Sequence, residues 1–125
     1  MKKVLQRIQL TLVIFFTLST YCAAQQCRFE LSNGKESATY FEAIQWYKNL
    51  DKASTNVLVK EMGMSDAGYP LHLILVSNDG KFDAAQWHKQ NKAVILIING
   101  IHPGEPDGID ASMMLVRYIV NSKIK

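Results

Sequence analysis

The stretch AVILIINGIHPGEPDG, residues 93–108, joins an unbroken apolar run to a turn rich in glycine and proline. Residues 93–98 carry no polar side chain, and a strand that is apolar on both faces is typical of the centre of a covered sheet. Apolar residues recur at helical spacing after the turn, at positions 109, 113, 116 and 120. The stretch therefore predicts a buried strand, a tight turn and an amphipathic helix in immediate succession.

Upstream of this stretch the sequence predicts a helix and then a hairpin. Thr39 and Glu42 have the spacing of a capping box, and apolar residues at helical spacing follow them. Residues 57–64 and 69–77 are apolar, partly β-branched segments separated by a short turn that contains glycine, which predicts two antiparallel strands. The order of helix, hairpin, polar connector, buried strand and helix predicts an α/β fold with a mixed β-sheet and flanking helices.

The first 24 residues have the pattern of a signal peptide. A positively charged start precedes an apolar segment at residues 8–18, and small residues at 22–24 offer a cleavage site before Gln25. The apolar segment is shorter than the roughly 20 residues that a membrane-spanning helix needs. We therefore expect cleavage, no stable membrane span afterwards, and an exported protein that is periplasmic or secreted.

Cleavage would leave a segment at residues 25–37 that leads into the fold, followed by the main body at residues 38–125. Of the two cysteines only Cys27 would remain, so no internal disulfide is expected, and we expect it unpaired near a flexible new terminus. The whole chain is 48% hydrophobic and 20% charged, which excludes extensive disorder. A net charge of +3 without a basic cluster excludes nucleic acid as a partner.

His102 and Glu105 lie three residues apart in the turn that follows the apolar run. Neutral imidazole and carboxylate are normal zinc ligands, and open α/β sheets bind ligands at the carboxyl ends of their strands. A turn whose histidine and glutamate only bond to the backbone fits the same pattern, so the residues alone leave both interpretations open. Asp107 and Asp110 are candidates to orient His102 from an outer shell, or alternatively to cap and support the following helix.

Residues 98–108, Ile-Asn-Gly-Ile-His-Pro-Gly-Glu-Pro-Asp-Gly, resemble the first zinc-binding segment of the M14 family of zinc metallocarboxypeptidases. The upstream order of elements is similar too, so the resemblance extends over residues 38–125, the N-terminal portion of that family's catalytic domain. It implies that His102 and Glu105 bind one Zn²⁺ per complete domain. It also implies that the full enzyme hydrolyses C-terminal peptide bonds of peptides or proteins. As a metal ligand, Glu105 would not be the general base.

The sequence also departs from the family pattern. Neither a second zinc-binding histidine nor a catalytic glutamate can be placed, because no His or Glu follows Glu105. We therefore expect a truncated domain that holds two zinc ligands and no catalytic residue, binds metal weakly and shows no peptidase activity alone. Two alternatives remain: a zinc-dependent acyl-amino-acid hydrolase of related fold, and a non-catalytic binding module.

Overall fold

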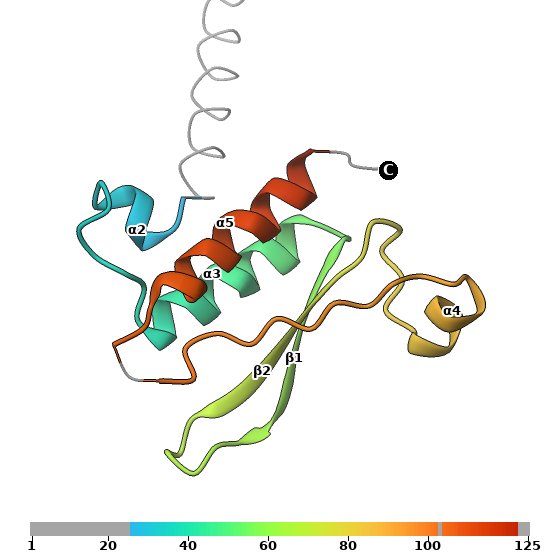
Figure 1. The fold of residues 1–125 in the computed structure, drawn as a ribbon, viewed down its shortest axis with the longest axis horizontal. Helices are drawn as coiled ribbons and strands as arrows, with labels where there is room; N and C mark the ends of the chain where they lie inside the picture. The colour runs from blue at the N-terminus through green and yellow to red at the C-terminus, as the bar shows by residue number, and fades with distance from the viewer. Residues whose placement is uncertain (1–25, 103, 123–125) are drawn as a thin grey trace, which may run out of the picture.

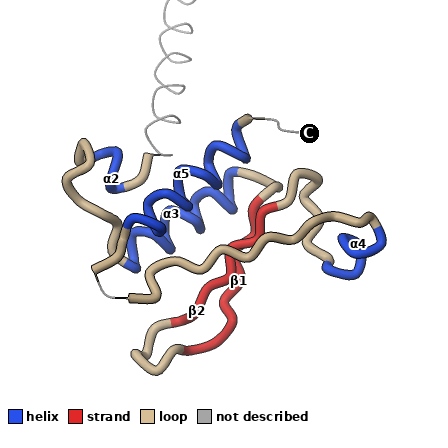
Figure 2. The backbone as a smooth tube through the Cα atoms, viewed as in Figure 1, coloured by secondary structure: helices blue, strands red, loops and turns tan. Residues whose placement is uncertain are grey.

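The structure is a computed structural model that describes residues 26–102 and 104–122. Its elements are α2 (Arg28–Leu31), α3 (Tyr40–Ala53), β1 (Val57–Met64), β2 (Pro70–Val76), α4 (Ala84–Lys89) and α5 (Asp107–Asn121). Helices α3 and α5 lie side by side, the hairpin of β1 and β2 extends from beside α3, and α4 lies apart from both helices (Figures 1 and 2). The expected signal peptide lies outside the described residues. No helix within the described ranges is long and apolar enough to cross a membrane.

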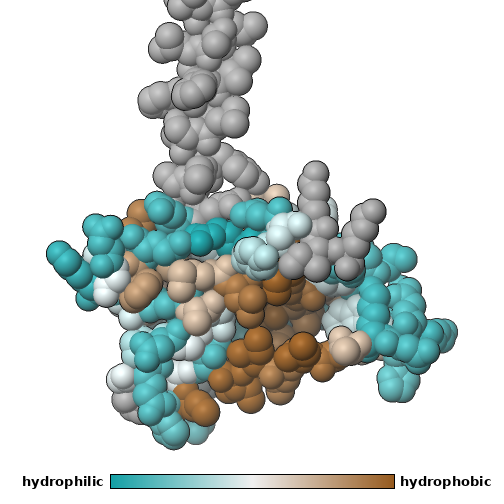
Figure 3. Space-filling model, turned by 45° about the horizontal axis from the view of Figure 1, so that its top comes forward, coloured by the Kyte–Doolittle hydropathy of each residue, from teal (hydrophilic) through white to brown (hydrophobic). Residues whose placement is uncertain are grey.

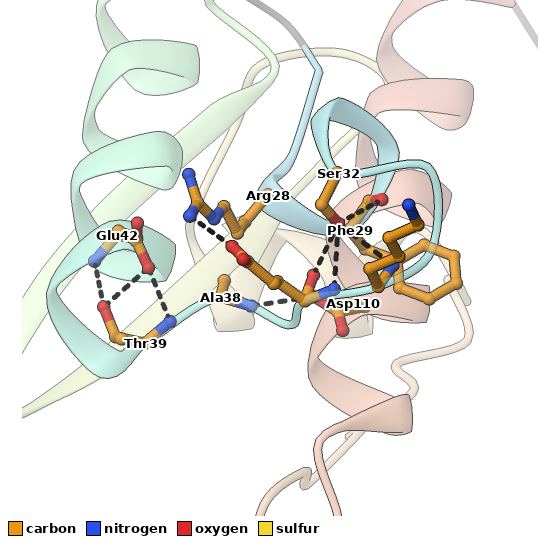
Figure 4. Close-up of polar contacts among 9 residues, drawn as sticks. Arg28, Phe29, Ser32, Ala38, Thr39, Glu42 and Asp110 are labelled. Atoms are coloured by element: carbon orange, nitrogen blue, oxygen red, sulfur yellow. Dashed lines mark hydrogen bonds and ion pairs between the residues drawn. The ribbon is translucent and has the colours of Figure 1, made fainter.

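Helix α3 begins at the predicted capping box. The backbone N–H of Thr39 donates to Glu42 Oε2 at 2.9 Å, and the backbone N–H of Glu42 donates to Thr39 Oγ1 at 3.4 Å (Figure 4). The two side chains thus satisfy amide groups that have no partner inside the first helical turn. One face of the helix is buried, and its buried residues are Ala43, Trp46, Tyr47 and Leu50.

The hairpin is confirmed with nearly the predicted bounds. Strands β1 and β2 pair antiparallel from Val57 opposite Val76 to Met64 opposite Pro70, with one irregularity between Glu61 and Gly63. Val57 is 2% exposed and joins the core beneath α3. Within the described part of the chain the sheet has these two strands only. The structure is therefore an α/β fold whose described sheet is antiparallel, not mixed.

The expected central strand at residues 93–98 is not formed in this structure. Residues 93–100 have no regular secondary structure, and the side chains of residues 94–98 are 54–82% exposed. Figure 3 shows a continuous hydrophobic area on the face that it displays. The apolar pattern indicates how a side chain would be buried, but a strand also needs neighbours for its backbone hydrogen bonds. Among the described residues no strand supplies them.

The segment before α3 is held by α2 and by Cys27, which is a free cysteine among the described residues and lies in the core. Its side chain is 1% exposed and packs in the core with residues of α3 and α5. Burial raises the pKa of the Cys27 thiol above its ordinary value of 9.0. Because the thiolate is the reactive form, this cysteine has a structural role and low reactivity.

Helix α4 lies in the polar connector between the hairpin and residues 93–98. Asp83 Oδ1 accepts from the backbone N–H of Ala85 at 2.9 Å, which caps the helix. Helix α5 begins one residue earlier than predicted, because Pro106 is its N-cap and has backbone angles that continue into the helix. Asp107 is therefore the first helical residue and not the cap; Asp110 lies in the first turn, as predicted.

Helix α5 contacts the segment before α3 at two places along its length. Met113 is 1% exposed in the shared core. One turn further along, Arg117 donates through both terminal nitrogens to the carboxylate of Glu30 in α2, each at 2.5 Å. Both side chains of this pair are only about one-fifth exposed (21% and 22%). These hydrogen bonds lower the pKa of Glu30 from 4.5 to about 2.

The capping box yields a first prediction. Thr39→Ala should lower the free energy of unfolding by about 1 kcal/mol, because the amide of Glu42 loses its acceptor at the start of α3. Thr39→Ser keeps the hydroxyl and should stay close to wild type. Urea unfolding followed by circular dichroism checks both variants, and an equal loss in Thr39→Ser would contradict the capping explanation.

The Glu30–Arg117 pair yields a second prediction. A carboxylate whose folded pKa is lowered stabilises the protein above its unfolded pKa, and this contribution disappears as the pH falls through the folded pKa. Glu30→Gln should therefore cost roughly 1–3 kcal/mol at neutral pH. The difference in unfolding free energy between the wild-type protein and Glu30→Gln should shrink as the pH falls from 4.5 toward 2. Unfolding free energies measured across this range test the assignment, which fails if the difference does not change with pH.

Candidate metal centre

The loop between residues 98 and 107 is anchored to α5 by Asn99. The side-chain nitrogen Nδ2 of Asn99 donates to Ser112 Oγ at 2.6 Å. Its other side-chain atom, Oδ1, lies 2.7 Å from the place where a Cβ on Gly108 would be. The missing side chain at Gly108 is therefore what lets Asn99 lie against the first turn of the helix. Sequence reasoning missed this role, although the Asn-Gly pair did mark the start of the turn.

The course of the loop also depends on Gly100, whose backbone lies close to the side chain of Ile109. Gly100 has φ +63, a left-handed conformation that side chains other than glycine rarely adopt. A Cβ there would also lie 2.8 Å from Ile109 Cδ1. Gly104, with φ +83, makes the second left-handed bend of the loop, in open space. Backbone geometry at both glycines turns the chain back toward the start of α5.

This turn brings the two predicted ligands together. His102 Nδ1 lies 3.0 Å from Glu105 Oε2, and the backbone N–H of Glu105 donates to the carbonyl oxygen of His102 at 3.4 Å. Their side chains are 70% and 68% exposed, so solvent and ions reach both atoms. A nitrogen and an oxygen bound to one tetrahedral zinc ion at ordinary distances are about 3.4 Å apart. The observed separation is a few tenths of an ångström shorter, because the two side chains hydrogen-bond to each other, and a zinc ion held by both would replace that hydrogen bond.

A third donor is not gathered around this pair. The described residues contain no group of three or more His, Cys, Asp or Glu side chains that could hold a metal ion. His72 lies on β2, where its Nδ1 is 3.3 Å from the Tyr40 hydroxyl, and that hydroxyl donates to the carbonyl oxygen of Pro70 at 2.7 Å. His72 is therefore a residue of the hairpin sheet and lies outside the loop. His88 is exposed on α4.

The two aspartates proposed for an outer shell lie in different surroundings. Asp110 is 3% exposed, and its Oδ1 accepts from the backbone N–H of Ala38 at 3.3 Å (Figure 4). Its carboxylate therefore links the start of α5 to the start of α3. Asp107 is exposed on the first turn of α5. An outer-shell role for either aspartate stays a prediction.

The contact between Asn99 and Gly108 yields a third prediction. Alanine inside a helix is favoured over glycine by about 1 kcal/mol. In Gly108→Ala that gain should be cancelled, because the new methyl displaces Asn99 from Ser112 and removes a hydrogen bond of about 1 kcal/mol. In an Asn99→Ala background the same change should stabilise the protein. A double-mutant cycle by urea unfolding measures the coupling, and additive effects would contradict the packing described above.

The comparisons with known proteins give one family match. The family model described as zinc carboxypeptidase, peptidase family M14, matches residues 43–125 as a partial domain. The match contains most of α3, both strands, α5 and the loop with His102 and Glu105. No curated protein and no solved structure matches the chain. Because the family model covers well over half of the sequence, this chain belongs to the zinc carboxypeptidase family M14.

Proposed function

We propose that this chain contributes the N-terminal part of a zinc carboxypeptidase domain, and that the full enzyme hydrolyses C-terminal peptide bonds of peptides or proteins. The observation that supports this most directly is the contact between His102 Nδ1 and Glu105 Oε2, inside the region that matches the family. The two donors converge on a solvent-accessible point at the end of a loop that Asn99 and Gly100 shape.

His102 and Glu105 would hold the zinc ion, His102 through Nδ1, because that is the nitrogen which faces the carboxylate. Bound zinc supplies Lewis-acid polarisation of the scissile carbonyl and lowers the pKa of a coordinated water. Glu105 would neutralise part of the metal charge, and this commitment prevents it from acting as the general base. The proton transfers of hydrolysis therefore require another acid–base group, which neither of these two residues provides.

Three finer points belong to the same proposal. The family match favours a peptidase over an acyl-amino-acid hydrolase and over a non-catalytic binding module. In the complete domain residues 93–98 would form a strand of a mixed sheet, as their two-sided apolar pattern favours. The signal-like residues 1–24 favour an exported protein, periplasmic or secreted, whose substrates are chain ends outside the cytoplasm.

Zinc binding gives a fourth prediction. Titration of the chain with Zn²⁺ by calorimetry should show weak binding at one site. His102→Ala should lower the affinity by more than the roughly 10–100-fold that loss of an outer-shell partner costs, because a direct ligand disappears. Glu105→Gln should weaken binding as well, because the charged oxygen donor is replaced by a neutral amide.

His88→Ala is the matched control, since His88 is exposed but lies on α4, away from the loop. It should bind zinc like the wild-type chain. Equal heats for the wild-type chain and His102→Ala would contradict the assignment, whatever the control shows. Peptidase assays on C-terminally blocked and free peptides complete the test, and the chain by itself should show no turnover.

A further inference from the structure

The chain contains two Asn-Gly pairs, Asn33-Gly34 and Asn99-Gly100. In such a pair the backbone nitrogen of the glycine, which no side chain shields, can attack the side-chain carbonyl carbon of the asparagine. The product is a succinimide ring, and the side-chain nitrogen leaves as ammonia. The contacts around each pair decide whether its nitrogen is free to attack and whether the side chain is held for the reaction.

In the first pair the nitrogen of the glycine is held by a hydrogen bond. The N–H of Gly34 donates to the carbonyl oxygen of Phe29 at 2.8 Å, and the N–H of Asn33 donates to the carbonyl oxygen of Glu30 at 3.1 Å. The ring of Phe29 also lies against Gly34, with Cζ 3.4 Å from the place where a Cβ would be. Attack by this nitrogen requires local opening of the turn, so the first pair should react slowly.

In the second pair the nitrogen is free and the side chain is held. No hydrogen bond ties the N–H of Gly100 to another described residue. The side-chain nitrogen Nδ2 of Asn99 donates to Ser112 Oγ at 2.6 Å. Its Oδ1 and Cγ lie 2.7 and 3.2 Å from the place where a Cβ on Gly108 would be, in the first turn of α5. The group that would be attacked is therefore fixed between two residues of one helix.

These two contacts lie where ring closure needs assistance. On attack the oxygen Oδ1 takes up negative charge, and the first turn of a helix favours negative charge because it is the positive end of the helix dipole. The nitrogen Nδ2 becomes a basic amine, which must gain a proton before its bond to carbon breaks. The hydroxyl of Ser112, 2.6 Å from Nδ2, is within the distance at which a side chain can donate that proton.

We propose that Asn99 is a site of self-catalysed deamidation with Ser112 as the proton donor. The nitrogen of Gly100 loses its proton to water and forms a bond to Asn99 Cγ, the bond from Cγ to Nδ2 breaks, and ammonia leaves with the proton from Ser112, which solvent restores. Water then opens the succinimide to aspartate or isoaspartate, and nothing is oxidised or reduced. The inference does not rest on the proposed enzymatic function, because neither His102 nor zinc takes part. Isoaspartate would lengthen the backbone by one methylene just before the loop that carries His102.

Incubation of the full chain in mildly alkaline buffer, followed by peptide mass spectrometry, tests the proposal. The amide of Asn99 should convert to the acid roughly five- to tenfold faster than that of Asn33, because the nitrogen of Gly34 must first lose a hydrogen bond. Asn33 lies in the same molecule and therefore serves as an internal control. Equal rates at the two asparagines, or faster conversion at Asn33, would overturn the proposal.

A pair of variants tests the role of Ser112. Ser112→Ala should slow the conversion of Asn99 by roughly tenfold or more, because the proton donor is lost. Ser122→Ala is the matched control, since Ser122 is at the other end of α5 and its hydroxyl donates to the carbonyl oxygen of Ile119. This control should convert Asn99 like the wild-type chain. The rate at Asn33 reports any general loosening of the fold in either variant. Unchanged or faster conversion of Asn99 in Ser112→Ala would show that the hydrogen bond only restrains the side chain, and would overturn the assignment of Ser112.

Discussion

The position of the candidate metal loop depends on how the first turns of α5 are held against α3. Met113 is 1% exposed in the shared core, and burial of a side chain of this size stabilises a fold by about 1.5–3 kcal/mol. One turn earlier, the buried carboxylate of Asp110 accepts from the backbone of Ala38, just before the capping box of α3. These two contacts, one apolar and one polar, fix the position of the first turns of α5. The hydrogen bond from Asn99 to Ser112 then fixes the loop relative to the helix.

The two candidate ligands differ from the core in one respect that suits a metal site. His102 and Glu105 are strongly exposed and contact each other, while the residues that position them are packed on α5. The loop is therefore anchored at its ends, and its middle presents two donors to solvent. A contact between side chains this exposed contributes little to folding stability.

The elements that follow from local signals could be predicted from the sequence. The capping box at Thr39 and the turn between two β-branched segments both act through neighbours within a few residues, so α3 and the hairpin are found where expected. The pairing of His102 with Glu105 was predictable for the same reason, since a bend of three residues brings the side chains together.

The remaining features depend on contacts between distant residues. Cys27 is buried because α3 and α5 close over it, and Asp110 contacts a residue 72 positions away. Helix α4 carries no apolar periodicity, so its one signal was the capping residue Asp83. In residues 93–98 the local pattern is strong but the structure does not follow it. The pattern indicates burial in a sheet whose neighbouring strands are not among the described residues.

The central claim is that His102 binds zinc through Nδ1 beside Glu105, and imidazole ¹⁵N nuclear magnetic resonance tests it most directly. The chain contains three histidines, so their ring nitrogens can be assigned and followed separately as Zn²⁺ is added. The account predicts that His102 Nδ1 shifts to the position of a metal-bound nitrogen, while both ring nitrogens of His72 and His88 stay unchanged. A shift at another histidine, or at His102 Nε2 in place of Nδ1, would contradict it.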